Sequence, residues 1–324
     1  MKIICELGSN FKSFDDCKTA ISLAKAVGAD AIKFQLYTHK ELYGIPGRTF
    51  DAGGVTKEAS ISMEGAMPRE WIEKLALKAQ AEQIEFLCTA FSVDGLHFID
   101  PFVKTHKLAS SEMCHLPMLR ALKAIDKPTL VSTGAQTITD LIAVRNVLRG
   151  LDVTWLLCEA AYPSRHLDMR RIPVLREIVQ ADVGLSDHTT DIFNIPLLAK
   201  QHGCTVIEKH FNPFNYTDTP DAPHSINIED FKAMVEVIRS DNIPTFGPTK
   251  DEEPMITTHK RRLVVTKDVA AGELLHQGVN YDVHRCKQPE HEAAHPFLTD
   301  VFDKLKAKCD LKAGQPLCGY HTDG

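Results

Sequence analysis

Two histidines stand at matching places late in the chain, each directly after a short, largely apolar run. His188 follows residues 183–187, and His210 follows residues 206–209. If the two runs are neighbouring strands, about 4.8 Å apart, both imidazoles can reach one divalent ion and leave positions open for substrate and water. The alternative is that each histidine only satisfies hydrogen bonds within the fold. The equivalent position of the pair favours a metal site made by His188 and His210.

Two lysines interrupt apolar runs, Lys33 within residues 31–34 and Lys107 at the start of residues 107–109. An ammonium group in such a setting needs an anion. Hydroxyl side chains occur in or directly after other runs, and these are Thr89, Ser110, Ser132 and Ser186. Together they predict a cradle for a phosphate or carboxylate, and two lysines suit a doubly anionic ligand. A Schiff-base lysine and an internal Lys–Glu ion pair remain open as alternatives.

Four carboxylates lie in or near the same stretches: Glu6, Glu112, Glu208 and Asp221. Beside lysines and a metal, they can orient the hydroxyl groups of a ligand or move protons. Simple charge balance is the alternative for each of them, and the sequence does not separate the two.

These residues need a scaffold that brings them together. Eight short apolar runs alternate with amphipathic segments, and the runs are residues 3–5, 31–34, 86–88, 107–109, 128–131, 155–158, 183–185 and 206–207. The segments at 15–27, 68–82, 138–148 and 193–202 are long enough for crossover helices. Eight such units predict an α/β protein with a closed (β/α)8 TIM barrel, and a doubly wound open sheet is the alternative.

In such a barrel the carboxyl ends of the strands form the catalytic face. Polar residues occur at all eight of these ends: Glu6; Lys33 and Gln35; Thr89; Lys107, Ser110 and Glu112; Ser132; Glu159 and Tyr162; Ser186, Asp187 and His188; Glu208 and His210. We therefore expect a polar pocket that binds a ligand with several polar or charged groups. The long polar stretch 38–67 is expected to be an elaborated loop on the same face.

The pattern of residue types changes after residue 240. Residues 1–240 are predicted to form the barrel, and residues 241–258, with three prolines and several acidic residues, to form a linker. Residues 259–324 hold two similar phrases, at 267–275 and 309–317, in which aspartate, alanine and glycine recur at one constant offset. This pattern predicts a small all-β domain with internal pseudo-symmetry.

The overall composition narrows the class of protein. The chain has 324 residues and a net charge of −6, which argues against nucleic acid as the main partner. It has no signal-peptide pattern and no apolar stretch long enough to span a membrane. Its nine cysteines include no CxxC pair, as expected for free thiols. We therefore expect a cytoplasmic enzyme whose substrates are small molecules.

Several phrases give the chain a specific resemblance. They are residues 5–10 (CELGSN), 28–35 (GADAIKFQ), 107–112 (KLASSE), 132–134 (STG), 162–163 (YP), 184–189 (GLSDHT) and 206–211 (VIEKHF). The sequence resembles the N-acetylneuraminate (sialic acid) synthase family, which includes legionaminate and pseudaminate synthases. The repeated phrases at the end resemble the antifreeze-like SAF domain of that family. The resemblance covers nearly the whole chain.

The resemblance implies the condensation of phosphoenolpyruvate with an N-acetylated amino-sugar aldehyde, such as N-acetylmannosamine, to give a nonulosonic acid and phosphate. The implied phosphoenolpyruvate-binding residues are Lys33, Thr89, Lys107, Ser110, Ser132 and Ser186, and Gln35 is a further candidate for substrate binding. Glu112, Tyr162 and Asp221 are implied on the sugar side. Glu6 and Glu208 are implied beside the reacting atoms, and with Glu112 they are the candidate catalytic residues. His188 and His210 would hold Mn²⁺, or else Mg²⁺ or Co²⁺.

The chain departs from the family pattern mainly on the sugar side. Ala160 stands where Asn or Ser is usual, and the family phrase Gly-Pro-Asp-His is here residues 219–222, ending in Ala222. Arg285 is the candidate for an arginine that, in relatives, reaches a partner's active site from the tail, which implies a domain-swapped homodimer. Two rival functions are a catalytically impaired homologue that binds sugar or acts as a scaffold, and a Schiff-base aldolase.

Overall fold

The computed structural model describes residues 1–38, 41–42, 50–52, 55–57, 67–165, 167–240, 250–285, 294 and 296–322. The chain divides into two compact units, Met1–Ile243 and Pro244–Gly324, and each is described by itself. No helix in the described ranges is long and apolar enough to cross a membrane. The cysteines within these ranges are free thiols, as the sequence predicted.

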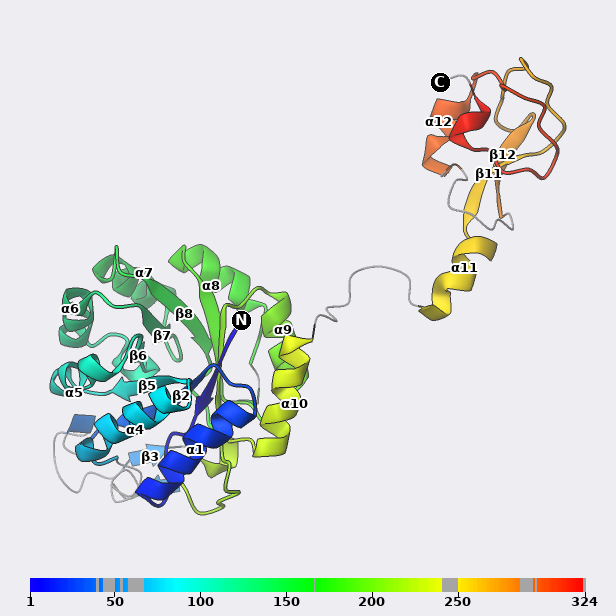
Figure 1. Ribbon diagram of the computed structural model, residues 1–324. Coiled ribbons are helices and arrows are strands. Elements are labelled where there is room, and N and C mark those ends of the chain that lie inside the picture. The colour runs from blue at the N-terminus through cyan, green and yellow to red at the C-terminus, as the bar shows by residue number, and fades with distance from the viewer. Residues whose placement is uncertain are drawn as a thin grey trace. The chain divides into compact units, whose positions relative to one another are not determined.

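The first unit is a closed barrel of parallel strands, so the predicted TIM barrel is confirmed and the open sheet is excluded (Figure 1). Around the barrel the strands follow the order β1-β10-β9-β8-β7-β6-β5-β2. Their bounds are β1 Lys2–Glu6, β2 Ala31–Leu36, β5 Glu85–Ala90, β6 His106–Leu108, β7 Thr129–Ser132, β8 Val153–Cys158, β9 Val183–Asp187 and β10 Val206–His210. Each contains or overlaps one of the eight predicted runs, and β1 closes the barrel by pairing with β10.

Helices surround the strands, as Figure 1 shows. They are α1 Phe14–Ala26, α4 Arg69–Ala81, α5 Val93–Ile99, α6 Leu116–Ile125, α7 Ile138–Val147, α8 Arg171–Val179, α9 Asn194–Gln201 and α10 Ile228–Arg239. Several begin at a residue whose side chain accepts a hydrogen bond from the first turn, namely Ser13, Ser92, Thr137 and Asn227. These caps explain why the helices start where they do. The main hydrophobic core lies between helices and strands.

A separate apolar cluster fills the lower part of the barrel interior. It consists of Ile4, Ala31, Leu87, Leu130, Leu156 and Val206, which come from six different strands. On β9 the corresponding position is Gly184, where a Cβ atom would lie 2.6 Å from the carbonyl oxygen of Val206. Glycine is required there because neighbouring strands already fill the space. The barrel is thus a packed core at this level.

The stretch predicted as an elaborated loop, residues 38–67, lies largely outside the described residues. Within it the structure has a short antiparallel pair, β3 Phe50–Ala52 and β4 Val55–Lys57. The remaining short helices are η1 Asp100–Phe102, η2 Ser110–Glu112, η3 Ala222–His224, η4 Lys250–Glu252, α11 Glu253–Thr258, η5 Pro296–Leu298, α12 Thr299–Phe302 and η6 Gly319–His321. Residues 241–249 of the predicted linker lie outside the described ranges.

The second unit has the antiparallel strands β11 Arg261–Val265 and β12 Tyr281–Arg285. Its two similar phrases are related by reciprocal hydrogen bonds. Asp268 accepts from the backbone N–H of Ala313 at 2.9 Å, and Asp310 accepts from the backbone N–H of Ala271 at 2.8 Å. The predicted internal repeat is therefore present in the structure, because the aspartate of each repeat accepts a hydrogen bond from the backbone of the other repeat.

Candidate active site

A polar layer lies next to the apolar cluster in the barrel interior, on the side of the carboxyl ends of the strands. Side chains alternate along a strand, so a residue two positions after an inward apolar residue also points inward. Seven polar residues occupy this layer, none more than 5% exposed: Glu6, Lys33, Thr89, Lys107, Ser132, Ser186 and Glu208. The structure thus brings together seven of the site residues expected from the sequence.

The two lysines and two glutamates of this layer form one ion-pair network. The Lys33 ammonium lies 2.8 Å from Glu6 Oε2 and 3.6 Å from Glu208 Oε1, and it donates to Thr89 Oγ1 at 3.1 Å. Lys107 Nζ lies 3.7 Å from the same Glu208 oxygen. The internal Lys–Glu pairing that the sequence left open is therefore present. Glu208 sits between both cations.

Three buried atoms of the polar layer have no hydrogen-bond partner among the described residues: Ser132 Oγ, Glu208 Oε2 and Glu6 Oε2, of which the last lies 2.8 Å from the Lys33 ammonium. Buried polar atoms are normally satisfied, so atoms of this kind leave a place for a ligand or an ordered water. The Glu6 carboxylate is held in position from the side, because Gln35 Nε2 donates to its Oε1 at 2.6 Å. The predicted residue Gln35 therefore orients Glu6 in this structure.

Burial and neighbouring charges set the proton affinities of the four charged groups. Burial, reinforced by Glu208, raises the pKa of Glu6 to about 7, although Lys33 works against the shift. Burial also works to raise the pKa of Glu208, but Lys107 and Lys33 outweigh it, and the pKa is lowered. Burial lowers the pKa of Lys107. Glu6 is therefore the carboxylate of this pair that holds a proton more readily.

A cluster of histidines borders the polar layer. The ring centroids of His210 and His224 are 4.5 Å apart, those of His188 and His210 are 5.6 Å apart, and those of His188 and His224 are 6.4 Å apart. Tyr162 lies against His188 with ring centroids 4.2 Å apart. His188 Nδ1 lies 2.9 Å from the carbonyl oxygen of Glu159, and His210 Nδ1 is a buried nitrogen with no hydrogen-bond partner among the described residues.

Asp221 joins this cluster through a tight contact with the end of β1. Its Oδ2 accepts from the backbone N–H of Ser9 at 2.8 Å and lies 3.5 Å from His210 Nδ1, while its Oδ1 lies 3.6 Å from His224 Nε2. Gly8 makes the approach possible. It has φ of +55°, and a Cβ atom there would lie 2.0 Å from Asp221 Oδ2. The turn after β1 must therefore carry glycine at this position.

His224 was missed by the sequence reasoning. The ligand atoms of His210, Asp221 and His224 all lie within 4.8 Å of one another, so this donor set fits a divalent ion. A signal was available: His224 follows Asp221 by three residues, the spacing that one turn of a 3₁₀-helix brings to the same side, and η3 spans Ala222–His224.

Three of the remaining predicted residues lie outside both the polar layer and the histidine cluster. Ser110 accepts a hydrogen bond from the backbone N–H of Gly134 at 2.9 Å. Glu112, at the end of η2, has an oxygen 3.4 Å from His115 Nδ1. Arg285 is exposed at the end of β12 and belongs to the second unit.

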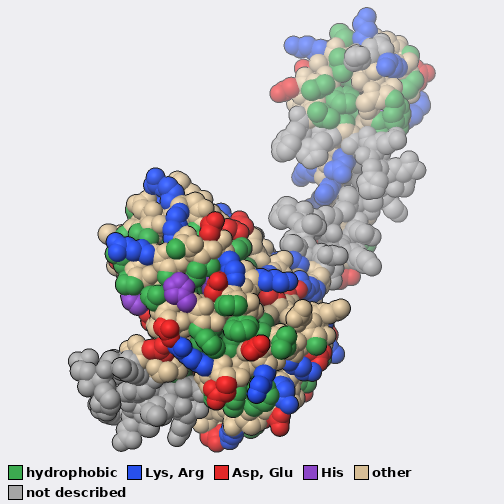
Figure 2. Space-filling model, turned by 60° about the vertical axis from the view of Figure 1, so that its left-hand side comes forward, with side chains coloured by type: hydrophobic (Ala, Val, Ile, Leu, Met, Phe, Trp, Pro, Cys, Tyr) green, Lys and Arg blue, Asp and Glu red, His purple; other side chains and the backbone are tan. Residues whose placement is uncertain are grey.

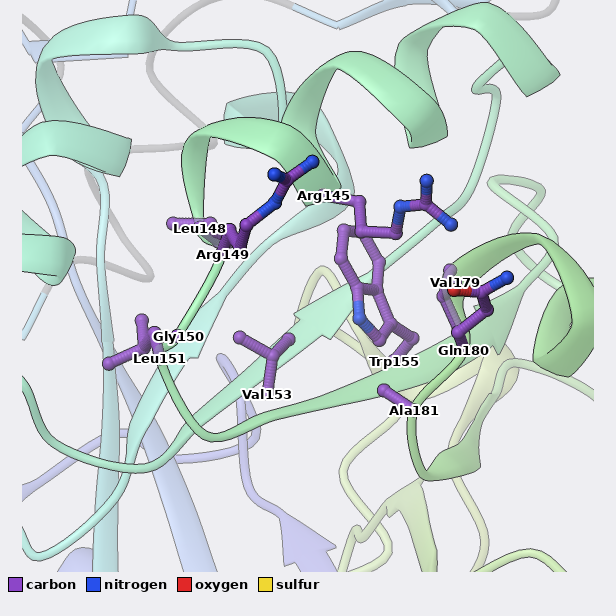
Figure 3. A pocket seen from close by; sticks show the side chains of 10 residues that line it. All are labelled: Arg145, Leu148, Arg149, Gly150, Leu151, Val153, Trp155, Val179, Gln180 and Ala181. Carbon is purple, nitrogen blue, oxygen red and sulfur yellow. The ribbon is translucent and has the colours of Figure 1, made fainter.

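A separate cavity of about 330 Å³ lies at the opposite, amino-terminal end of the barrel strands, near the start of β8. Figure 3 shows the guanidinium groups of Arg145 and Arg149 and the indole of Trp155 around it. It contains none of the site residues. On the face seen in Figure 2, basic and acidic side chains are interspersed.

The chain is similar to known proteins over nearly its whole length. The sequence is 32% identical over 334 residues to the pseudaminic acid synthase of Campylobacter jejuni, covering 97% of this chain and 94% of that protein. It is 30% identical to the pseudaminic acid synthase of Helicobacter pylori, covering 98% and 96%. The crystal structure of a spore coat polysaccharide biosynthesis protein E from Chromobacterium violaceum has the same fold, with a TM-score of 0.76 at 23% identity and 99% of both chains covered. A model of the NeuB family matches residues 20–243, and the chain belongs to that family.

Proposed function

We propose that this protein is a synthase that condenses phosphoenolpyruvate with an N-acetylated amino-sugar aldehyde to give a nonulosonic acid and inorganic phosphate. One observation carries the proposal: two buried lysines and the unpartnered Ser132 Oγ and Glu208 Oε2 lie in the barrel interior of a NeuB-family chain. Phosphoenolpyruvate carries a carboxylate and a phosphate, and Lys33 and Lys107 supply one cation for each.

The reaction balances with water as the third reactant. A bond forms between C3 of phosphoenolpyruvate and the aldehyde carbon, whose oxygen takes up a proton. Water then adds at C2 and loses a proton, and the C2–O bond to phosphate breaks, so phosphate leaves with the bridging oxygen. The product is a 2-keto acid lengthened by three carbons.

The residues of the polar layer have distinct roles in this scheme. Lys33 and Lys107 hold the anion and fix its C3 atom, which turns a bimolecular step into one between oriented partners. Glu6, whose pKa is raised, is placed to give a proton, and Glu208, whose pKa is lowered, to accept one from water. Thr89, Ser132 and Ser186 supply hydroxyls to the bound anion. Buried surroundings strengthen each of these contacts.

The histidine cluster fits a divalent cation, which we take to be Mn²⁺, with Mg²⁺ or Co²⁺ as alternatives. Its support is the buried, unpartnered Nδ1 of His210 beside further nitrogen and oxygen donors. Such an ion supplies Lewis-acid polarisation of the aldehyde oxygen when bound. We propose that Asp221, Tyr162 and Glu112 contact the sugar.

For the sugar, we favour a precursor of a pseudaminic-acid-type product over N-acetylmannosamine. The support is that the two relatives named as pseudaminic acid synthases match nearly the whole chain at 30–32% identity. The altered residues Ala160 and Ala222 lie on the sugar side, as a change of sugar requires.

We also propose a domain-swapped homodimer in the cytoplasm. Arg285 of the second unit would contact the sugar in the barrel of the other subunit, because the described barrel strand ends offer no arginine for this role. Free cysteines in the described ranges agree with a reducing compartment. Sedimentation of the purified chain should give a dimer.

The function is tested by phosphate release from phosphoenolpyruvate across a panel of amino-sugar aldehydes, with and without EDTA. Release with one N-acetylated sugar, lost with EDTA and restored by Mn²⁺, is the expected result. Borohydride trapping of pyruvate on a lysine would instead identify a Schiff-base aldolase. Tight sugar binding without phosphate release would identify an impaired homologue.

A further inference from the structure

We propose that the cavity at the amino-terminal end of the barrel is a second binding site, for a small molecule that carries a phosphate group on a flat ring. The cavity has a volume of about 330 Å³ and is lined by Val153, the first residue of β8. From there β8 runs five residues to Cys158 at its carboxyl end, which is roughly 16 Å of strand. A ligand of this cavity is therefore separate from the two substrates of the proposed reaction.

The indole of Trp155 gives the cavity a flat apolar wall. Trp155 is only 1% exposed, and it lines the cavity together with Val153 and Val179. Among the described residues no group accepts a hydrogen bond from the indole N–H, and Figure 3 shows the indole nitrogen on the edge of the ring nearer Val153. Aromatic rings stack on an indole face, and its N–H needs an acceptor when it is buried. Trp155 can therefore bind both the ring and an oxygen of such a ligand.

Three cationic side chains lie around the same cavity. Arg145 and Arg149 line it, and Lys123 Nζ is close to a third lining residue, Gly150, where a Cβ atom would lie 3.4 Å from that nitrogen. In the part of the chain that the structure describes, no carboxylate oxygen lies within 4.0 Å of these three cations. The residues that line the cavity include no aspartate or glutamate. In a chain with a net charge of −6, such a group of unpaired cations favours an anionic ligand.

Both arginines are held in place and still have free donors. Arg145 Nη1 donates to the carbonyl oxygen of Ile178 at 2.7 Å, which ties α7 to the last turn of α8. Arg149 Nη2 donates to Oδ1 of Asn146 at 3.0 Å. A guanidinium group has five N–H donors, so each side chain keeps others for a ligand. Paired N–H donors of this kind match the oxygens of a phosphate.

Two helix ends oppose an anion here, but the cations outweigh them. α7 ends at Val147 and α8 ends at Val179, both beside the cavity. Each helix C-terminus carries roughly half a negative elementary charge. The three cationic side chains carry three full positive charges, and Arg145 already binds one of the carbonyl groups at the end of α8. The balance at the cavity is therefore positive.

The volume of the cavity limits the size of the ligand. A volume of about 330 Å³ equals that of about eleven water molecules in the liquid and lies at the small end of the range for small-molecule sites. One ring with one phosphate group fits this space. The combination of three cations with one aromatic wall suits that class of molecule better than an anion or a ring alone.

The test uses phenyl phosphate as the probe and the full-length chain. Trp71 and Trp155 are the two tryptophans of the chain, so Trp71→Phe leaves Trp155 as the only indole. Phenyl phosphate should change the fluorescence of this variant, and calorimetry on the unaltered chain should give a dissociation constant below the millimolar range. Inorganic phosphate, which lacks the ring, and benzyl alcohol, which lacks the charge, should each bind at least about tenfold more weakly.

Variants then locate the probe. Arg149→Gln and Lys123→Gln should each weaken phenyl phosphate binding about tenfold, the effect of losing one charge-assisted hydrogen bond. The matched control Arg171→Gln removes an exposed arginine at the other end of α8, and it should leave the affinity unchanged. Lys107→Met, which alters the polar layer, should also leave it unchanged. Thermal unfolding shows that each variant is folded.

Three results would overturn the proposal. They are absence of phenyl phosphate binding to the unaltered chain, binding that is unchanged in both Arg149→Gln and Lys123→Gln, and binding that Lys107→Met weakens as strongly as Arg149→Gln does. The last result would place the probe in the polar layer. Equal affinity for inorganic phosphate would remove the ring from the proposed ligand class and so would contradict it as well. None of these measurements involves the condensation reaction, so they stand or fall separately from the proposed function.

Discussion

Two layers of side chains fill the barrel interior: an apolar layer (the lower layer) and, two residues further toward the carboxyl ends of the strands, a polar layer (the upper layer). Both layers come from the same strands, but one is apolar and the other carries charges and hydroxyl groups. The lower layer is apolar, and two residues further along five of its strands the upper layer is ionic or hydroxylic: Ile4 and Glu6, Ala31 and Lys33, Leu87 and Thr89, Leu130 and Ser132, Val206 and Glu208. Both layers are buried. A shift of two residues, about 6.6 Å along a strand, therefore separates a packing core from a site.

The difference shows which part of the interior stabilises the fold. Apolar side chains in the lower layer gain free energy by leaving water. Charged groups in the upper layer lose hydration, and their mutual attraction only partly offsets that loss. Replacing buried ion pairs by apolar side chains is often neutral or stabilising, so stability does not explain the charges of the upper layer, and we propose that they serve a ligand.

The largest expected effect comes from the upper layer. Glu208→Gln keeps the shape of the side chain but removes the negative charge, and with it the base, that lies between Lys33 and Lys107. We expect the rate of phosphate release at saturating substrate to fall ~10²–10⁴-fold. Loss of one partner of a buried ion pair should also lower the free energy of unfolding by about 3–5 kcal/mol, so the rate is measured on protein that thermal unfolding shows to be folded. A rate within tenfold of the unaltered enzyme would contradict the role given to Glu208.

The second effect comes from the lower layer and should fall on stability alone. Leu156→Ala opens a cavity in the apolar cluster and should lower the free energy of unfolding by ~2–5 kcal/mol. Phosphoenolpyruvate affinity, measured by calorimetry on the folded variant, should change little. A large loss of affinity with normal stability would show that the two layers are not separable in this way.

A third effect concerns the anion cradle. Lys33→Met or Lys107→Met removes one cation and keeps most of the apolar stem. Loss of a charge-assisted hydrogen bond should cost ~1.5–3 kcal/mol of phosphoenolpyruvate binding, which is tenfold or more in affinity. If calorimetry finds unchanged affinity in both variants, the lysines do not hold this substrate.

The smallest expected effect is the pH dependence of phosphoenolpyruvate binding. Burial raises the pKa of Glu6 to about 7, and a bound anion nearby should raise it further. Phosphoenolpyruvate binding should then take up part of a proton near neutral pH, and affinity should fall as pH rises above 7. Calorimetry in buffers of different ionisation enthalpy measures the uptake. Glu6→Gln should abolish it, and uptake that persists in this variant would assign the proton to another group.

Much of the barrel could be predicted because its signals are local. Each strand is a short apolar run, and helix starts carry Ser, Thr or Asn caps. The upper layer could be anticipated from lysines and glutamates in such runs. The sequence left a Lys–Glu ion pair open but could not say which residues pair, since Lys33 meets Glu208 only when the barrel closes. His224 was missed because its three-residue spacing from Asp221 brings the two together only in a 3₁₀ turn, η3, which the sequence analysis did not predict.

The pairing of β1 with β10 has a consequence for how the protein is made. Glu6 and Lys33 leave the ribosome before their partner Glu208, which follows about 200 residues later, or roughly 10–40 s at ordinary rates of synthesis. During that interval the nascent chain carries these charged groups on strands that have no closed barrel to enter. Water solvates them during this time. Burying these charges costs free energy in the finished site, but in the unfinished sheet the same charges should oppose pairing of its exposed strands with other chains.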